Sequence, residues 1–119
     1  MNNTILVRRH SSGFSIDYSL YENQYFTVES LGSGTISLTI PATGTVSAYS
    51  LTSISYRKDG DDWTTIERST SQTTTTINVA SGDKVYFKAE RKVSSQRLSI
   101  DFAVPFFELL VVTISKESE

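Results

Sequence analysis

Residues 25–40, YFTVESLGSGTISLTI, contain two runs in which apolar and polar side chains alternate around a glycine-rich turn. A period of two is typical of a β-strand with one buried face and one solvated face. Glycine between two such runs favours a turn, because glycine adopts backbone conformations that other residues avoid. The segment therefore predicts two joined strands, whose shared apolar face is made of Phe26, Val28, Ile36, Leu38 and Ile40.

A second strand pair is predicted around the Asp-Gly dipeptide at residues 59–60. This dipeptide tolerates a positive φ at the tip of a hairpin. A two-residue loop would set Tyr56 opposite Trp63 but would send Ile54 and Ile66 to opposite faces. A longer loop or a bulge would set Ile54 opposite Ile66 instead. We expect the bulge, because both halves of the hairpin need a core face.

The same alternation recurs towards both ends of the chain, and no stretch has the sustained i, i+3, i+4, i+7 apolar spacing of a helix. We therefore predict a single all-β domain over residues 1–119 with no helix. Its expected architecture is an antiparallel β-sandwich, Ig-like or jelly-roll-like, of about 8–10 short strands. Residues 1–23 are expected to form N-terminal strands or an arm, and residues 97–115 the C-terminal strands.

The C-terminal segment 106–115 is apolar on both faces of the expected strand. Such a strand belongs in the middle of a sandwich or against another chain. We expect a central strand. We also take one of its faces as a candidate assembly surface, made of Phe106, Leu110, Val112 and Ile114.

Composition limits the classes of function. The 119 residues allow one core, Ser and Thr occupy 34 positions, and cysteine is absent, which fits synthesis in a cytoplasm. The net charge of −2 argues against a nucleic-acid binder that works by neutralising phosphates. Basic residues do gather between Lys84 and Arg97, and we interpret them as a solvated loop with its flanking strand faces.

The residues that usually carry catalysis or bind metals are missing or isolated. His10 is the only histidine, and it has no nearby acidic or histidine partner in the sequence. The aspartates at 59, 61 and 62 lack the spacing of a calcium loop and are expected to be turn residues. We therefore predict no enzyme activity, no metal and no cofactor. The start of the chain lacks a signal-peptide pattern, and Pro105 and Glu108 interrupt the longest apolar run, so no membrane insertion is expected.

Aromatic side chains offer a candidate carbohydrate site. Trp63 with Tyr56 and Tyr49, or with another of the tyrosines at 18, 21 and 25, would present flat rings with polar rims. The alternative is that this single tryptophan packs in or at the edge of the core.

Three segments together resemble a β-rich module common in proteins of gut Bacteroides and of their tailed, crAss-like phages. They are YFTVESLGSGTISLTI (residues 25–40), ISYRKDGDDWTTI (54–66) and INVASGDKVYFKAE (77–90), so the similarity spans residues 24–92. The hairpin is similar to an Asp-box turn, but Lys58 stands where that pattern has Asp. The resemblance implies a structural or adhesive protein of a virion or cell surface.

The resemblance and the residue patterns favour two functions. The first is a non-enzymatic virion protein, such as a capsid decoration or auxiliary protein or a fibre or tail attachment module. It would be synthesised in the host cytoplasm and would bind other virion proteins or copies of itself. The second is a carbohydrate-binding adhesion module on a phage tip or a bacterial surface, with surface glycans as its ligands.

Overall fold

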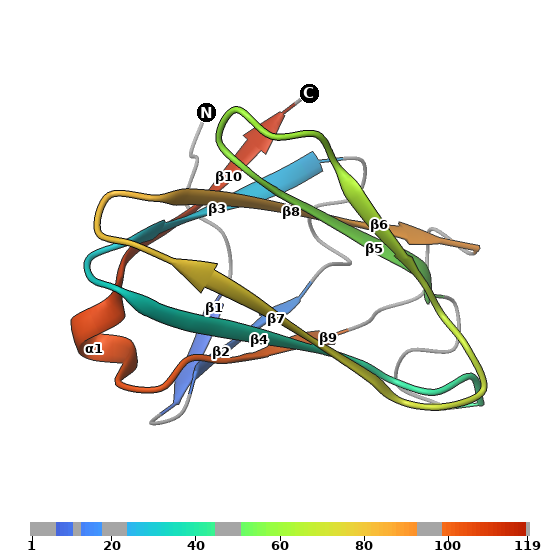
Figure 1. Ribbon diagram of the computed structural model, residues 1–119. Coiled ribbons are helices and arrows are strands. Elements are labelled where there is room, and N and C mark those ends of the chain that lie inside the picture. Colours follow the sequence, from blue (N-terminus) through green and yellow to red (C-terminus); the bar gives the residue numbers. More distant parts are fainter. Residues whose placement is uncertain (1–6, 11–12, 18–23, 45–50, 93–98, 119) are drawn as a thin grey trace.

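The computed structural model describes residues 7–10, 13–17, 24–44, 51–92 and 99–118 (Figure 1). Ten strands and one helical turn are present in this part of the chain. In chain order they are β1 (Val7–His10), β2 (Gly13–Asp17), β3 (Gln24–Ser30), β4 (Gly34–Ile40), β5 (Leu51–Lys58), β6 (Thr64–Glu67), β7 (Thr73–Val79), β8 (Lys84–Arg91), β9 (Ser99–Ala103), α1 (Phe107–Leu110) and β10 (Val111–Ser118).

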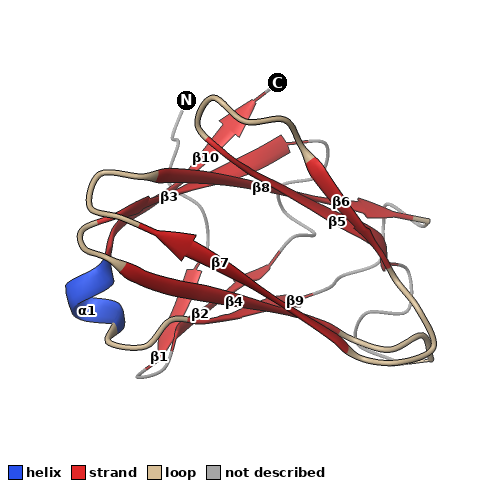
Figure 2. Ribbon diagram, viewed as in Figure 1, coloured by secondary structure: helices blue, strands red, loops and turns tan. Residues whose placement is uncertain are grey.

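The strands form two five-stranded sheets that pack face to face (Figure 2). The first sheet has the order β1-β2-β9-β4-β7, and the second has the order β10-β3-β8-β5-β6. All neighbouring strands are antiparallel. The predicted antiparallel β-sandwich is therefore confirmed. Strands from both ends of the chain complete the two sheets, because β2 pairs with β9 and β10 pairs with β3.

Four buried phenylalanine rings occupy the centre of the sandwich. Phe14 stacks on Phe102 in the first sheet, with ring centroids 4.6 Å apart. Phe26 stacks on Phe87 in the second sheet at 5.4 Å, and Phe87 meets Phe102 edge to face at 4.8 Å. These contacts join the sheets through ring geometries that aromatic pairs favour. The apolar face predicted for residues 25–40 is likewise buried.

The β5–β6 hairpin has the expected register. Ile54 lies opposite Ile66, and Tyr56 lies opposite Thr64 instead of Trp63. The amide of Asp61 donates to the carbonyl of Lys58 at 2.9 Å, and Gly60 has a φ of 90° at the tip. The predicted pairing of the two isoleucines is therefore confirmed, but a longer loop over residues 59–63 produces it, and the pairing of β5 with β6 has no bulge.

The C-terminal segment differs from the prediction. Residues 107–110 form the helical turn α1, and β10 is an edge strand, not a central one. Side chains at helical spacing point into the core: Phe107, Leu110, Val111 and Ile114. Phe106 and Leu109 are 79% and 70% exposed.

The expected assembly face is therefore corrected. Leu110 and Ile114 belong to the core of this chain, and Phe106 is exposed. The side chain of Val112 lies outside the described residues.

Contacts with the β3–β4 turn explain why the helical turn forms there (Figure 1). The carbonyl of Leu110 accepts hydrogen bonds from the hydroxyl of Ser30, at 3.0 Å, and from the amide of Leu31. A Cβ on Gly34 would lie 2.8 Å from a methyl group of Leu110, so the leucine fills space that the missing side chain leaves. Backbone hydrogen bonds and close packing thus outweigh the strand preference of an apolar run. No described helix has the length and apolar character needed to cross a membrane.

Candidate functional site

The outer face of the second sheet carries a group of aromatic and cationic side chains. On β8, Val85 and Phe87 are fully buried, so Tyr86 and Lys88 take the opposite face, away from the core. Arg57 on β5 lies directly opposite Tyr86, and Tyr25 on β3 precedes the buried Phe26. We call Tyr25, Arg57, Trp63, Tyr86 and Lys88 the aromatic–cationic cluster.

Trp63 reaches this face from the β5–β6 loop. Its ring meets Tyr25 edge to face, with centroids 6.2 Å apart, and Tyr25 meets Tyr86 in the same way at 5.6 Å. All three rings are half-buried. The long loop that keeps Ile54 opposite Ile66 also frees Trp63 from strand pairing. The tryptophan can therefore lie over the sheet instead of within it.

Two cations lie against these rings. The guanidinium carbon of Arg57 is 4.3 Å from the centroid of Tyr86 and 5.3 Å from that of Trp63. The ammonium of Lys88 is 4.4 Å from the centroid of Trp63. Cations within about 6 Å of an aromatic face are attracted by the ring quadrupole. The rings therefore hold both cations in place on the surface of the sheet.

Asp59 is a carboxylate at the rim of the cluster. The hydroxyl of Tyr86 donates a hydrogen bond to Asp59 at 3.2 Å. Burial raises the pKa of Tyr86 above its ordinary value of 10.0, and the charge and hydrogen bond of Asp59 raise it further. Tyr86 is therefore a neutral hydrogen-bond donor at physiological pH.

Hydroxyl groups lie beside the rings on the same face. Ser55, opposite Lys88, is 2.9 Å from the hydroxyl of Thr65. Thr27, opposite Tyr86, is 7% exposed, and its hydroxyl has no hydrogen-bond partner among the described residues. A buried hydroxyl without a partner is uncommon and costs free energy. The face therefore combines ring surfaces, cations and hydroxyls.

The predicted aromatic platform is only partly assembled. Trp63 lies in the cluster, but Tyr56 lies opposite the fully buried Phe87 and packs against the core on the other face. Tyr49 lies outside the described residues. The sequence interpretation missed Arg57, Tyr86 and Lys88 as members of this site. Alternation with Val85 and Phe87 already places Tyr86 and Lys88 on the solvent face.

A second surface feature is an apolar patch beside α1, made of Leu31, Phe106 and Leu109. Leu31 is 51% exposed, and the other two are more exposed still. A groove of about 370 Å³ adjoins the patch, lined by Gly32, Ser33, Gly34, Thr35, Pro105, Phe106, Leu109 and Leu110.

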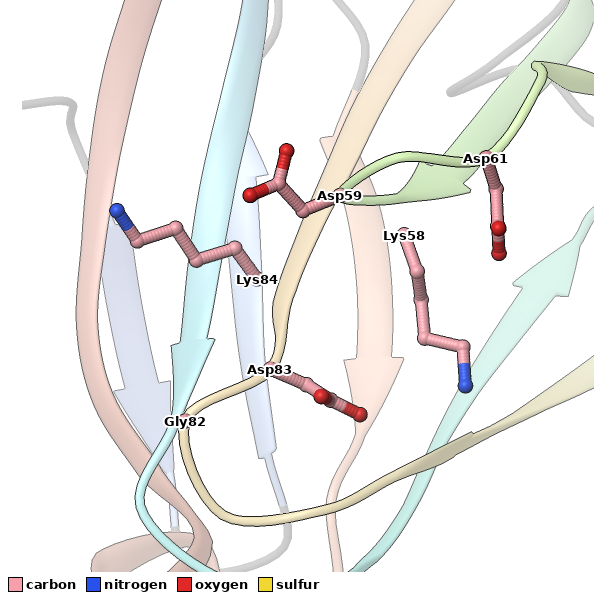
Figure 3. A pocket seen from close by; sticks show the side chains of 6 residues that line it. All are labelled: Lys58, Asp59, Asp61, Gly82, Asp83 and Lys84. Atoms are coloured by element: carbon pink, nitrogen blue, oxygen red, sulfur yellow. The ribbon is translucent and has the colours of Figure 1, made fainter.

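A third feature is a polar cleft of about 410 Å³ between the β5–β6 and β7–β8 turns (Figure 3). The carboxylates of Asp59, Asp61 and Asp83 point in different directions in Figure 3 and do not converge. Asp83 instead accepts a hydrogen bond from the amide of Ala80 at 2.8 Å, and Lys58 donates to the carbonyl of Asn78 at 3.0 Å. Within the described residues, no group of three or more His, Cys, Asp or Glu could hold a metal ion. Asp83 thus stabilises the β7–β8 turn, and Lys58 links β5 to β7.

Comparison with known proteins gives little further information. No protein-family model matches the chain, and no curated protein matches it. Among solved structures, the chain is similar to an exo-β-1,3-galactanase from Phanerochaete chrysosporium, solved with galactose, at 11% identity and a TM-score of 0.45. The match covers 97% of this chain and 26% of the galactanase, so the chain spans about a quarter of that protein's length. A similarity this weak gives no evidence about the activity or the ligand of this chain.

Proposed function

We propose that this domain is a non-enzymatic structural protein of a phage virion that acts by protein–protein assembly. Its role would be capsid decoration, an auxiliary capsid function, or attachment within a fibre or tail. The virion context rests on the family resemblance of residues 24–92. The observation that carries the assembly function is the exposure of Phe106 and Leu109, at 79% and 70%, beside an apolar groove.

The backbone at the patch supports this proposal. Phe106 has φ 56° and ψ 48°, and it is the only described residue other than glycine with a positive φ. A bulky residue in the left-handed region costs about 1–2 kcal/mol, and an exposed phenylalanine ring contributes little to its own fold. Residues that are both strained and exposed are typical of binding sites.

The neighbouring edge of the second sheet supports the same proposal. Strand β10 follows α1 directly and is the end strand of its sheet in the described part of the chain. An open strand edge can pair with another chain. The partners would be other virion proteins or copies of this chain, and the apolar patch and the β10 edge would form one continuous contact surface.

Light scattering over a concentration series, on the wild-type protein and on Phe106→Asn, tests the assembly function. Asparagine is polar and tolerates the left-handed conformation, so we expect the variant to be as stable as wild type or up to about 1 kcal/mol more stable. The wild type should form an oligomer or grow in mass with concentration, and the variant should stay near 13.2 kDa.

A wild-type monomer at every concentration would contradict assembly between copies. An oligomer unchanged by Phe106→Asn would contradict the role of the patch. Thr74→Asn, on β7 of the first sheet, provides an exposed control that should leave the mass unchanged.

A second candidate function is carbohydrate binding by an adhesion module on a phage tip or a bacterial surface. It is favoured by the half-buried rings of Tyr25, Trp63 and Tyr86 on one outer face. Flat rings beside hydroxyl groups suit the apolar faces and polar edges of sugars.

A further inference from the structure

We propose that the aromatic–cationic cluster binds saccharides that carry a carboxylate, such as sialic or uronic acids. The proposal rests on the second candidate function and specifies its ligand class. It is independent of assembly, because it uses none of the residues of the apolar patch.

Arg57 is held against two aromatic rings. Its guanidinium carbon lies 4.3 Å from the centroid of Tyr86, and Trp63 provides a second ring at 5.3 Å. A guanidinium carries five N–H donors in a planar fork, and this fork matches the two oxygens of a carboxylate. Because the rings already hold Arg57, binding an anion costs less side-chain entropy than binding to a mobile arginine.

The cluster also holds two positive charges on one ring. Lys88 lies 4.4 Å from the centroid of the same Trp63 ring that Arg57 contacts, so two cations share one indole. Two positive charges beside one ring repel each other, and a bound anion that contacts both would relieve that repulsion. Asp59, at the rim of the cluster, accepts the hydrogen bond from Tyr86 and carries the opposite charge. Arg57, Lys88 and Asp59 together carry a net positive charge, on a chain whose net charge is −2.

Ring surfaces and a hydroxyl beside the cations favour a saccharide over a small anion. Ring surfaces of Tyr25 and Trp63 adjoin the cations and suit the apolar C–H face of a pyranose. The exposed hydroxyl of Thr65, which lies 2.9 Å from that of the buried Ser55, can hydrogen-bond a sugar hydroxyl. Nucleic acid suits the site less well, because phosphate backbones are bound by rows of cations and this cluster has two.

The single tryptophan of the chain gives a direct readout, since its fluorescence reports from within the cluster. The probes are 3′-sialyllactose and lactose, which differ by one acidic sugar. We expect sialyllactose to shift the emission of Trp63 and to bind at least tenfold more tightly than lactose. Arg57→Gln should reduce that affinity at least tenfold. Arg57→Lys should also reduce it, because lysine keeps the charge but loses the bidentate geometry.

Lys84→Gln is the matched control, because it removes one positive charge from the same sheet, at the start of β8, outside the cluster. It should change the affinity less than twofold, and thermal unfolding of each variant establishes that it is folded. Equal binding of sialyllactose and lactose would overturn the acidic specificity and leave carbohydrate binding intact. If neither sugar binds, both the acidic specificity and the carbohydrate-binding function are overturned, and the assembly function is not affected.

Two further probes, inorganic sulfate and a single-stranded oligonucleotide, test whether the cluster binds small anions or nucleic acid instead. A shift of equal size with inorganic sulfate would show an anion site without sugar recognition, and tighter binding of a single-stranded oligonucleotide would show a nucleic-acid site. Either result overturns the proposal. Unchanged sialyllactose affinity in folded Arg57→Gln would do so as well.

Discussion

Two aromatic residues, Phe106 and Tyr56, lie in different environments because their backbones differ. Phe106 is strained and exposed, whereas Tyr56 is half-buried and packs against the core. Both are aromatic residues in predicted strands, and their local sequence does not distinguish them. What differs is the backbone: Phe106 precedes a helical turn, while Tyr56 keeps the strand period that brings it opposite Phe87.

At the same scale, Tyr86 makes stability depend on pH. Its pKa is raised in the folded state, first by burial and then by Asp59, relative to 10.0 when exposed. A raised pKa means that the folded state favours the neutral phenol. The resulting stability is fully present below pH 10 and is lost as the pH rises through the folded-state pKa.

We therefore expect the free energy of unfolding to fall more steeply above pH 10 in wild type than in Tyr86→Phe, which cannot ionise at this position. Urea denaturation at intervals of half a pH unit from pH 8 upward measures both slopes. The other tyrosines titrate in both proteins, so the difference between the curves isolates Tyr86. Parallel curves over the whole range would show that Asp59 and burial do not act on this phenol.

At the scale of elements, the strands with one wet face could be predicted and the C-terminal turn could not. Phe26 and Val28 alternate with polar residues, and a period of two is visible within one strand. Residues 106–115 are apolar at nearly every position, so any period fits them. The choice of a helical turn depends on Ser30 and Leu31, about 80 residues earlier, which hydrogen-bond to Leu110.

The cluster was only partly predictable for the same reason. Tyr25, Arg57 and Tyr86 lie on three strands that become neighbours through the sheet order β3-β8-β5. Alternation places each side chain on the solvent face of its own strand, but it carries no information on which strands pair. Trp63 was identified from its type alone, and its partners required the pairing.

Gly13 shows that close strand packing can depend on one missing side chain. It opens β2, is buried, and pairs with Ala103 of β9. A Cβ built on Gly13 would overlap the carbonyl oxygen of Phe102 and lie 2.9 Å from its carbonyl carbon. Backbone atoms in the middle of a sheet cannot move aside as the end of a side chain can.

Gly13→Ala should therefore destabilise the domain by about 3 kcal/mol, equivalent to a fall of roughly 10 °C in melting temperature. Gly44→Ala is the comparison. Its Cβ would meet no atom within 4 Å, but its φ of 96° makes alanine unfavourable, at a cost of about 1 kcal/mol. Differential scanning calorimetry of both variants should rank Gly13→Ala as the more severe, and the reverse order would refute the steric argument.

At the scale of the whole molecule, the sandwich is closed by strands from opposite ends of the sequence. The pairing of β10 with β3 runs from Val111 opposite Ser30 to Ser118 opposite Gln24. The sequence pattern predicts strands in residues 97–115 but does not decide whether they complete this core or pair with a neighbouring chain. Burial of Phe107 and Ile114 against the rest of the core shows that they complete it.

Deleting residues 106–119 should therefore unfold the domain. The deletion removes four buried side chains, Phe107, Leu110, Val111 and Ile114, each worth about 1.5–3 kcal/mol when fully buried. It also exposes the full edge of β3 and removes the carbonyl that binds Ser30 and Leu31. The sum is comparable with the total stability of about 5–15 kcal/mol that small domains have.

Circular dichroism and the dispersion of amide signals in an NMR spectrum measure this outcome directly. Phe106→Asn is the matched control within the same segment, since it removes the exposed ring and keeps the buried ones. An unfolded deletion beside a folded, monomeric Phe106→Asn would separate the two roles of the C-terminal segment, with Leu110 and Ile114 holding the core and Phe106 contacting partners. A deletion that stayed folded with dispersed signals would mean that β10 contributes little to the core and that its edge position serves assembly instead.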